Sequence, residues 1–527
     1  MDFNLADLFE RVADTVPDRV ALAAGDRRLT YAELDARANR FAHHLRAHGV
    51  EVGAHVGIYA HNRAEWFESM LGCYKARVVP INVNYRYVVD ELRYLFDNAD
   101  LVALVYEATF SSTVAAVQAD APRLAHFVVI DDGAERAEGP AQAVEYEVAL
   151  DAAPDTRDGL TPRAPDDLYV LYTGGTTGMP KGVMWRQEDI FFAALGGGNY
   201  GGPPITRPEA ISDALGEHQM TTLALAPLMH GNAQWTSLVT MFGGNKLVLF
   251  TERRYDADAI WDLAERETVN TISLVGDAMA RPLVDALAQR SAPASLVAVV
   301  SGGAILSPSI KAEIQARLPS VMVLDSFGAS ETGANGAVDV TASGPRFRMN
   351  EWTTVIGDDF GPIAPGEIGL LARRGHVPLG YFKDAEKTAA TFVEVDGVRW
   401  AVPGDRAVIE DDGTITVLGR GSQSINTGGE KVFPEEVEAV LKAHPAVFDV
   451  LVVGVSDPRW GEHVSALVQP RDGMAVTLDD VQTHCRAHLA GYKAPRTLTI
   501  VEHIERTPAG KPNYRWAREL AGREHAG

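Results

Sequence analysis

The stretch "LYTGGTTGMPKGV", residues 171–183, joins an apolar run to a loop rich in glycine and threonine, with Lys181 near its end. The apolar letters "DLYVLY" that lead into it predict a buried strand. Glycines lack Cβ atoms, so backbone N–H groups of such a loop can approach a phosphate closely, and Lys181 adds a positive charge. The stretch therefore predicts a strand followed by a phosphate-binding loop. The loop residues are Thr173, Gly174, Gly175, Thr176, Thr177 and Gly178.

Two other nucleotide-binding patterns do not fit. The Walker A pattern, G-x-x-x-x-G-K-[ST], fails at every register of this loop. The letters "GGGNYG", residues 196–201, satisfy the dinucleotide pattern G-x-G-x-x-G, but the following "GPP" cannot open the helix that must receive a pyrophosphate. We interpret residues 196–201 as a surface loop. On composition alone, an ordinary turn is the alternative for residues 173–178.

Outward from this stretch, apolar strands alternate with amphipathic helices. Residues 29–50 place apolar side chains at helical spacing, and Thr30 with Glu33 forms a capping-box pattern at the start. This rhythm predicts an α/β fold whose mostly parallel sheets are covered by helices. The predicted strands are "HVGIYAHN", "LVALVY", "HFVVID", "LALAPLMH", "NKLVLF", "TISLVG" and "LVAVVSGG".

The last third of the chain has a different sequence pattern, with short β segments separated by glycines. After about residue 365, "GEIGLLARRG" and "RAVIEDDGTITVLGRG" predict a small β-rich subdomain. The final segment, about 100 residues long, alternates helix, strand and helix, which is enough for a small α+β domain. A Gly/Ser-rich junction at residues 419–424 separates the two parts. We predict an N-terminal domain over residues 1–419 and a C-terminal domain over residues 420–527.

Composition excludes several classes of function. The 527 residues carry a formal net charge of −23, which disfavours nucleic acid and anionic membranes as partners. Cys73 and Cys485 are too few for a disulfide framework and indicate two free thiols in a reducing compartment. The start lacks a basic leader, and no apolar run reaches the roughly 18 residues of a membrane span. We expect a cytoplasmic protein without an integral membrane segment.

A second polar segment, "DSFGASETG" at residues 325–333, follows the apolar "VMVL" and so lies at the carboxyl end of a predicted strand. Ligands bind at such ends in open α/β sheets. Phe327 offers a flat face for a base, Ser330 a hydroxyl, and Glu331 a hard oxygen ligand for Mg²⁺. Taken singly, an aromatic here is usually core and a loop Glu usually solvated. The further candidates are Asp325, Ser326 and Gly328, with Gly303 and Ala304 of the upstream "SGGA".

Four isolated residues add candidate chemistry. His230 follows an apolar run in "APLMHGN", although a lone loop histidine is usually structural. Asp405 in "PGDRA" suits ribose hydroxyls, and Arg420 follows it in "GR". Lys511 stands on the Gly-flanked loop "TPAGKPNY", where a solvated surface lysine is the alternative.

One pair of histidines suggests a metal at first sight. His44 and His48 are spaced i, i+4 in "HHLRAH", like half of a zinc-binding helix. No Glu stands where the H-E-x-x-H pattern requires it. We interpret the pair as a solvated helix face and assign no zinc.

In this order, the motifs resemble those of the adenylate-forming superfamily, which includes acyl-CoA synthetases, firefly luciferase and peptide-synthetase adenylation domains. The matching segments span residues 171–511, and "LTYAELDARANRFAHHL" also resembles the family's opening. Several motifs in register are far more specific than any one. The matching segments are TGGTTGMPKG, APLMHG, SGGA, FGASETG, PGD, GR, NTGGEKVFPEEVE and TPAGK.

The resemblance implies two half-reactions and a small C-terminal domain that swings on a hinge. A carboxylate attacks the α-phosphorus of ATP to give an acyl-adenylate and pyrophosphate, and the CoA thiol then displaces AMP. Thr173 to Lys181 would embrace the β- and γ-phosphates, and Thr176 with Glu331 would hold Mg²⁺. Lys511 would bridge the substrate carboxylate and the α-phosphate.

The remaining roles follow in the same way. Phe327 would cover adenine beside Gly303 and Ala304, and Asp405 with Arg420 would contact the ribose. His230 would gate the acyl group. The loop that contains Gly428, Gly429 and Glu430 would line the pantetheine path.

The sequence departs from the family pattern at two positions. Ser422 stands in "GRGSQS" where the hinge residue is often Asp or Lys. Ser330 replaces the Thr that usually precedes the metal-binding Glu, and it keeps the hydroxyl.

The choice within the family depends on the acyl side. The segment "HGNAQWTSLVTMFGG" lacks the Asp that would pair with an amino acid's ammonium, which disfavours amino acids, and luciferase activity has no support. The stretch "GMPKGVMWRQEDIF" resembles bacterial acyl-CoA synthetases that act on fatty acids or bulky sterol side-chain acids. We predict an AMP-forming acyl-CoA ligase for an apolar carboxylic acid, with ATP, Mg²⁺ and CoA.

Two alternatives stay open. One is a fatty-acyl-AMP ligase that passes its product to a carrier protein, although no carrier segment follows the C-terminal domain. The other is a non-catalytic nucleotide-binding regulatory protein, which would have little reason to keep both Lys511 and Glu331. A homodimer is among the oligomeric states open to such an enzyme.

Overall fold

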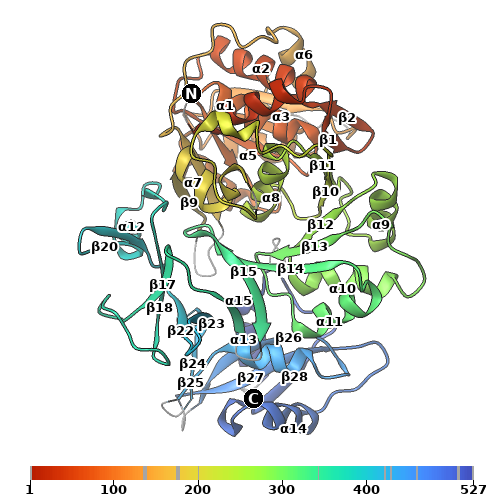
Figure 1. Ribbon diagram of the computed structural model, residues 1–527, viewed down its shortest axis with the longest axis vertical. Coiled ribbons are helices and arrows are strands. Elements are labelled where there is room, and N and C mark those ends of the chain that lie inside the picture. Colours follow the sequence, from red (N-terminus) through yellow and green to blue (C-terminus); the bar gives the residue numbers. More distant parts are fainter. Residues whose placement is uncertain are drawn as a thin grey trace.

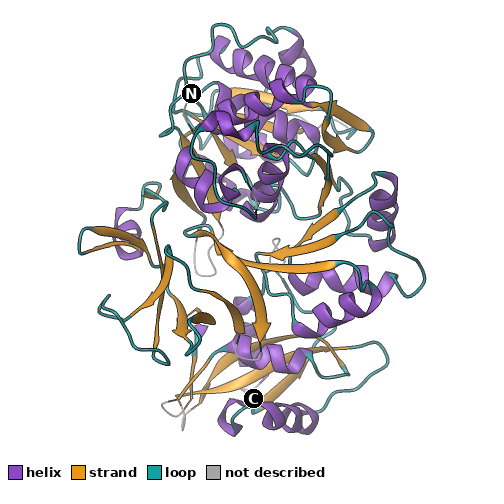
Figure 2. Cartoon of the chain, in the orientation of Figure 1, coloured by secondary structure: helices purple, strands orange, loops and turns teal. Residues whose placement is uncertain are grey.

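The structure, a computed structural model, contains four β-sheets flanked by helices (Figures 1 and 2). The N-terminal elements lie at one end of the long axis and the C-terminal elements at the other. The described residues are 3–134, 139–173, 179–199, 201–341, 344–420, 423–427, 430–457, 461–506 and 511–524.

A five-stranded parallel sheet with the order β4-β3-β5-β6-β7 forms part of the N-terminal end. The predicted helix after Thr30 is confirmed as α2, whose first turn is closed by a capping box between Thr30 and Glu33. The strands are β3 (His55–Tyr59), β4 (Val79–Asn82), β5 (Leu101–Glu107), β6 (His126–Ile130) and β7 (Val144–Glu145). The helices around it are α1 (Leu5–Thr15), α2 (Tyr31–Ala47), α3 (Ala64–Lys75), α4 (Val89–Asn98), α5 (Ser111–Gln118) and α6 (Tyr146–Asp151).

The largest sheet begins with six parallel strands in the order β1-β11-β10-β12-β13-β14, and β2 pairs antiparallel with β1 at its edge. This arrangement confirms the predicted helix-covered parallel sheet. The strands are β1 (Val20–Ala24), β2 (Arg27–Thr30), β10 (Thr221–Ala224), β11 (Lys246–Leu249), β12 (Thr271–Leu274), β13 (Ala298–Gly302) and β14 (Met322–Ala329). The helices between them are α8 (Gly231–Phe242), α9 (Ala257–Arg266), α10 (Gly276–Ala286) and α11 (Pro308–Arg317).

The same sheet continues into an antiparallel, β-rich part. It begins at Gly333, earlier than the predicted change near residue 365, because β14 folds back directly into β15. The glycines and alanines of β15 have low intrinsic strand preference, so pairing to the existing sheet decides their conformation. The strands are β15 (Gly333–Thr341), β16 (Gly344–Arg348), β17 (Thr353–Ile356), β18 (Ile368–Arg374), β20 (Phe392–Val395), β21 (Val398–Ala401), β22 (Asp405–Ile409) and β23 (Thr414–Arg420).

The glycine- and threonine-rich stretch lies in a small antiparallel sheet with the order β19-β9-β8. β8 (Leu168–Thr173) and β9 (Lys181–Arg186) form a hairpin in which Thr173 is opposite Lys181. β19 (Gly380–Tyr381) pairs with the other side of β9, α12 (Ala385–Thr391) follows it, and α7 (Gln187–Ala194) follows β9. The segment 174–178 lies outside the described residues.

The C-terminal residues form a separate five-stranded sheet with its own buried core, which includes Val437, Leu441, Val452 and Val468. The predicted helix, strand and helix of this region are confirmed as α13, β26 and α14. The strands are β24 (Ile425–Thr427), β25 (Glu430–Val432), β26 (Val447–Asp457), β27 (Gly461–Pro470) and β28 (Thr497–Ile500). The helices are α13 (Pro434–Lys442), α14 (Leu478–His488) and α15 (Tyr514–Glu524).

The cysteines and the helix lengths can also be compared with the sequence. Cys73 and Cys485 are free and buried. Burial raises the pKa of the Cys485 thiol to about 12, which makes it inert. Within the residues that the structure describes, every helix is too short or too polar to span a bilayer.

A buried ion cluster ties α1, α2 and α3 together. Lys75 has no exposed side-chain surface, and its Nζ lies 2.5 Å from Glu10 Oε1 and 2.7 Å from Asp35 Oδ1. Replacing Lys75 by methionine leaves two buried carboxylates that only arginines still neutralise, so we expect a loss of about 3 kcal/mol in unfolding free energy. Urea unfolding followed by circular dichroism measures this loss.

The matched control is Arg93→Met. Arg93 pairs with Asp90 and Asp120, but all three side chains are exposed, so its loss should cost less than about 1 kcal/mol. Equal losses for the two variants would contradict a stabilising role for the buried cluster.

Candidate active site

The β8–β9 hairpin brings Lys181 next to the segment that contains Tyr381 and Asp384. Lys181 Nζ lies 2.6 Å from Asp384 Oδ2 and 5.9 Å from the centroid of the Tyr381 ring. Its hydrogen bond lowers the pKa of Asp384. The predicted phosphate-binding lysine is thus held in place at the start of β9, at the loop end of the hairpin.

Glu331 lies beside this group. The hydroxyl of Tyr381 donates to Glu331 Oε1 across 2.9 Å. Trp185 of β9 fixes the neighbouring backbone, since its Nε1 donates to the carbonyl of Ser330 across 3.0 Å. The structure therefore gathers Lys181 and Glu331, which the sequence predicts as phosphate and metal ligands.

Tyr381 and Asp384 were not predicted as site residues. They come from β19 and the start of α12, about 200 residues after the hairpin, in the segment "GYFKDAEKT". Their signal is weak in the sequence, because an isolated tyrosine and aspartate in a polar stretch suit any surface turn.

The carboxyl end of β13 packs closely against β14 and against the start of α8. Ser326 Oγ donates to the carbonyl of Ser301 across 3.0 Å. A Cβ on Gly302 would lie 2.6 Å from Ser326 Oγ and 2.8 Å from Asn232 Nδ2. Gly303 follows with φ +85°, a conformation that favours glycine. The predicted Gly303 and Ala304 thus lie on a crowded turn that faces the start of α8.

The other β14 candidates have structural contacts of their own. Phe327 is half-buried and stacks on Phe347, with ring centroids 5.9 Å apart. Burial raises the pKa of Asp325 to about 7, although hydrogen bonds from Leu306, Ser326 and Ser301 oppose the shift. Gly328 tolerates no side chain, because a Cβ would lie 2.5 Å from the carbonyl oxygen of Gly333.

His230 is the N-cap residue of α8, although its side chain makes no capping hydrogen bond. Burial lowers its pKa to about 3, with help from the positive charges of Lys511 and Arg86. Among the described residues, no hydrogen-bond partner reaches the buried atoms His230 Nε2 and Asn232 Oδ1. Buried polar atoms are normally paired, so this pair of atoms fits a bound ligand.

Two contacts position the His230 loop against β8. Asn82 Nδ2 donates to the carbonyls of Tyr172 and Met229, across 2.8 Å and 2.7 Å. A Cβ on Gly231 would lie 2.6 Å from Leu171 Cδ2. These contacts place the histidine loop close to the end of β8.

Asp405 and Arg420 are opposite each other, at the start of β22 and the end of β23. Asp405 is buried. Glu435 of α13 approaches this strand end, since a Cβ on Gly419 would lie 2.4 Å from Glu435 Oε2. Burial, together with Glu438 and Asp405, raises the pKa of Glu435 to about 8.

The C-terminal domain lies over this end of the sheet. α13 packs against β16 and β23, and Lys442 Nζ lies 3.2 Å from Asp277 Oδ2 of α10. The Arg281 guanidinium lies 5.6 Å from the centroid of the Phe448 ring. In this arrangement the exposed Lys511 acts electrostatically on His230. Two predicted residues that lie far apart in the sequence therefore influence each other electrostatically.

Several predicted site residues cannot be placed. The loop residues Gly174, Gly175, Thr176, Thr177 and Gly178 lie outside the described residues, as do Gly428 and Gly429. For these positions the sequence prediction stays a prediction.

The Tyr381–Glu331 hydrogen bond gives a prediction of its own. Tyr381→Phe removes the donor but keeps the ring beside Lys181, so Glu331 loses its orientation while its charge is unchanged. We expect the affinity for MgATP to fall about 10-fold, the scale on which lost partners of ligating groups act. Isothermal titration with MgATP measures it.

The control is Tyr255→Phe, which removes a hydroxyl that donates to the carbonyl of Met279. That variant should bind MgATP as the original protein does. An unchanged affinity in Tyr381→Phe would remove its hydroxyl from the site.

Comparison with known proteins assigns the family. Residues 9–382 match the family described as AMP-binding enzyme, and residues 436–511 match the family described as AMP-binding enzyme C-terminal domain. The chain is 46% identical over 538 residues to a 3-oxocholest-4-en-26-oate–CoA ligase of Rhodococcus rhodochrous, covering 99% of this chain and 96% of the relative.

Two further relatives agree. A medium/long-chain-fatty-acid–CoA/3-oxocholest-4-en-26-oate–CoA ligase of Mycolicibacterium smegmatis is 46% identical over 535 residues, covering 99% of this chain and 97% of the relative. A feruloyl-CoA synthase of an Amycolatopsis species is 30% identical over 518 residues, covering 95% and 96%.

Solved structures match the fold. An anthranilate CoA ligase in complex with anthranoyl-AMP superposes with a TM-score of 0.86 at 23% identity, covering 99% of this chain and 98% of the other. ATP-bound MatB from Rhodopseudomonas palustris gives a TM-score of 0.79 at 24% identity, covering 99% of both. The matched families span nearly the whole chain in the order that its motifs predict. The chain belongs to the AMP-binding enzyme family, within the adenylate-forming superfamily.

Proposed function

We propose that this enzyme is an ATP-dependent, AMP-forming acyl-CoA ligase that activates an apolar carboxylic acid. The observation that carries the proposal is the buried Nε2 of His230, which has no hydrogen-bond partner among the described residues and on which the positive charge of Lys511 acts. A cation and unsatisfied polar atoms at the carboxyl ends of parallel strands suit an anionic substrate. The relatives named as CoA ligases for fatty and sterol acids support the same activity.

In the first half-reaction, a carboxylate oxygen of the acid attacks the α-phosphorus of ATP, and pyrophosphate leaves with the electrons of the broken P–O bond. Two anions must approach each other, and the ammonium of Lys511 offsets their repulsion at close range. Lys181 and the loop of residues 173–178 would hold the departing phosphates. Asp405 and Arg420 would hold the ribose, and Phe327 the adenine.

The site also fits Mg²⁺. Glu331 provides a hard oxygen ligand, and the hydroxyl of Tyr381 orients it. We propose Glu331 and Thr176 as the residues that hold the ion. When bound, Mg²⁺ supplies positive charge to the phosphate oxygens.

In the second half-reaction, the CoA thiolate attacks the acyl carbon, a C–S bond forms, and AMP leaves. Lys511 has no role in this step, and we propose that the C-terminal domain, residues 420–527, rotates near Ser422 to bring the loop of Gly428 and Gly429 to the pantetheine path. The described contacts across the boundary include two ion pairs, Lys442 with Asp277 at 3.2 Å and Arg471 with Glu313 at 3.9 Å, and polar contacts of this kind suit an interface that must open.

The acyl side of the site argues for an apolar acid. α8 begins directly after His230 and contributes no carboxylate, so a substrate ammonium would stay unpaired there. Trp235 of α8 donates to the hydroxyl of Tyr169 and offers an apolar face. We therefore propose medium- to long-chain fatty acids or sterol side-chain acids as substrates.

The proposal extends to location and assembly. Two buried free cysteines suit the reducing cytoplasm. A homodimer is the oligomeric state to test first, by sedimentation at several protein concentrations.

The decisive experiment measures pyrophosphate release with MgATP over short, long and sterol-derived acids, with and without CoA, and identifies products by mass spectrometry. We expect acyl-CoA from the long and sterol-derived acids. Acyl-AMP without thioester would instead indicate an acyl-AMP ligase, and a preference for acetate or glycine would contradict the apolar substrate. No turnover with any acid would refute the proposed activity.

A further inference from the structure

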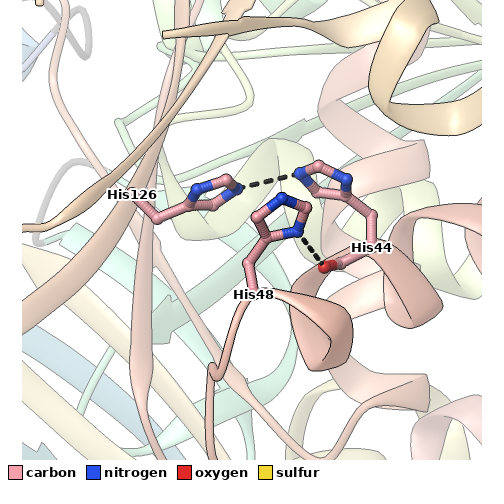
Figure 3. Close-up of side chains that lie close together, drawn as sticks. All are labelled: His44, His48 and His126. Carbon is pink, nitrogen blue, oxygen red and sulfur yellow. Dashed lines mark hydrogen bonds between the residues drawn. The ribbon is translucent and has the colours of Figure 1, made fainter. Parts of the chain in front are cut away.

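Three histidines meet at the end of the molecule opposite the C-terminal domain. His44 and His48 come from the last turn of α2 and its C-cap, and His126 comes from the start of β6. One ring nitrogen from each lies within 4.8 Å of one from each of the others (Figure 3). The sequence shows only the i, i+4 pair, because His126 lies about 80 residues further along the chain.

The hydrogen bonds leave nitrogen lone pairs inside the cluster. His48 Nδ1 donates to the carbonyl of His44 across 2.8 Å, so the lone pair of a neutral His48 lies on Nε2. Figure 3 shows this second nitrogen of His48 facing the space between the other two rings. A backbone carbonyl that fixes the ring tautomer in this way is the usual support of a metal-binding histidine.

The other two rings approach each other directly. His44 Nε2 and His126 Nε2 are 2.9 Å apart, so one of them must be an N–H donor and the other an acceptor when no ion lies between them. Burial lowers the pKa of His44 to about 3, and burial with the nearby His48 lowers the pKa of His126 to about 4. Burial thus disfavours the charged form of both rings.

We propose that His44, His48 and His126 form a binding site for a divalent transition-metal ion, with Zn²⁺ as the best fit. Imidazole nitrogens bind Zn²⁺ at about 2.0–2.1 Å in tetrahedral geometry, which puts neighbouring ligand atoms roughly 3.3 Å apart. The His44–His126 separation of 2.9 Å would widen by a few tenths of an ångström, and the separations that now reach up to 4.8 Å would shorten, so the ion requires rotation of the His48 side chain. Water completes the fourth position on the side of His48, which is exposed.

The electrostatic setting favours a cation. The cluster lies at the carboxyl end of α2, where the helix dipole is negative. The ion would take the place of the hydrogen bond between the His44 and His126 rings. It would join α2 to the fourth strand of the parallel sheet, which makes its role a structural brace rather than a part of acyl transfer.

A second group of histidines in the same chain provides contrast. His484 and His488 of α14 repeat the i, i+4 spacing, and His444 lies across from them, with its ring centroid 5.1 Å from that of His484. There, His484 Nε2 is engaged with the carbonyl of Val440 at 3.0 Å. This group has the same composition without convergent nitrogens, so it is the internal control.

The test is calorimetric titration of Zn²⁺ into the chelator-treated full-length protein at pH 7. We expect one Zn²⁺ per chain, and His126→Gln should lower the affinity by more than the roughly 10–100-fold that loss of an outer partner costs. His488→Gln should leave the binding unchanged. Co²⁺ in place of Zn²⁺ should give the visible absorption bands of a tetrahedral site in the original protein and in His488→Gln.

Two further measurements distinguish a lost metal ligand from a misfolded variant. His48→Gln changes an exposed side chain, so it should remove zinc binding with an unchanged circular dichroism spectrum. Zn²⁺ should raise the melting temperature of the original protein and of His488→Gln, but not that of His48→Gln. The proposal would be overturned if the original protein bound no zinc, or if folded His48→Gln and His126→Gln bound zinc as tightly as the original protein.

Discussion

Replacing Lys511 by alanine is expected to slow acyl-adenylate formation by about 10³-fold while ATP binding is retained. Removal of one preorganised donor to a developing charge costs about 10²–10³-fold, and Lys511 would face two anions at once. The lysine is exposed and lies at the start of a segment that leads into α15, so its side chain supports no buried core. The loss should therefore be chemical and not structural.

The measurement separates the two half-reactions. Pyrophosphate release reports adenylation, and thioester formation from supplied acyl-AMP and CoA reports the second step. Lys511→Ala should lose the first and keep the second. Arg515→Ala is the matched control, because Arg515 is an exposed cation of the same domain that pairs with Glu519. Near-normal adenylation by Lys511→Ala would refute the assigned role.

Much of the fold could be predicted because its signals are local. The capping box of Thr30 and Glu33 lies within one helical turn, and each predicted strand is a short apolar run bounded by turn residues. The start of the antiparallel region was misjudged because Gly333 begins a strand that only its neighbour β14 specifies. Pairing between segments overrides local preference there.

The residues of the candidate site also fall into two groups, those that a local motif indicates and those that only contacts between distant segments indicate. Lys181, Glu331, His230 and Lys511 could be predicted because each stands in a distinctive motif. Tyr381 and Asn232 were missed because their roles depend on contacts with partners far away in the chain. No property of a single tyrosine or asparagine indicates such a contact before the chain is folded.

His126 is the clearest example of a residue whose role cannot be predicted before the chain is folded. The i, i+4 pair of His44 and His48 was interpreted as a solvated face, and its third partner enters only through the pairing of β6 with β5. His44 is in fact buried. A ligand set spread over a helix and a distant strand has no spacing rule that a sequence could reveal.

Replacing Glu331 by glutamine should raise the Mg²⁺ concentration needed for half-maximal adenylation by about 10- to 100-fold. Glutamine keeps the size of the side chain and an oxygen that can accept from the Tyr381 hydroxyl, so the local packing survives. What is lost is one negative charge, which a hard cation needs from its ligands. Titration of free Mg²⁺ at a fixed ATP concentration, with pyrophosphate release as the readout, measures the change.

The Tyr381→Phe variant makes this test specific. It keeps the charge of Glu331 and removes only its orientation, so its metal requirement should rise less than that of Glu331→Gln. High Mg²⁺ should restore Tyr381→Phe almost fully and Glu331→Gln only in part, because one ligand is weakened in the first case and replaced in the second. An unchanged metal dependence in Glu331→Gln would remove Glu331 from the metal site, and the Tyr381–Glu331 hydrogen bond would then be a purely structural link between β19 and the turn after β14.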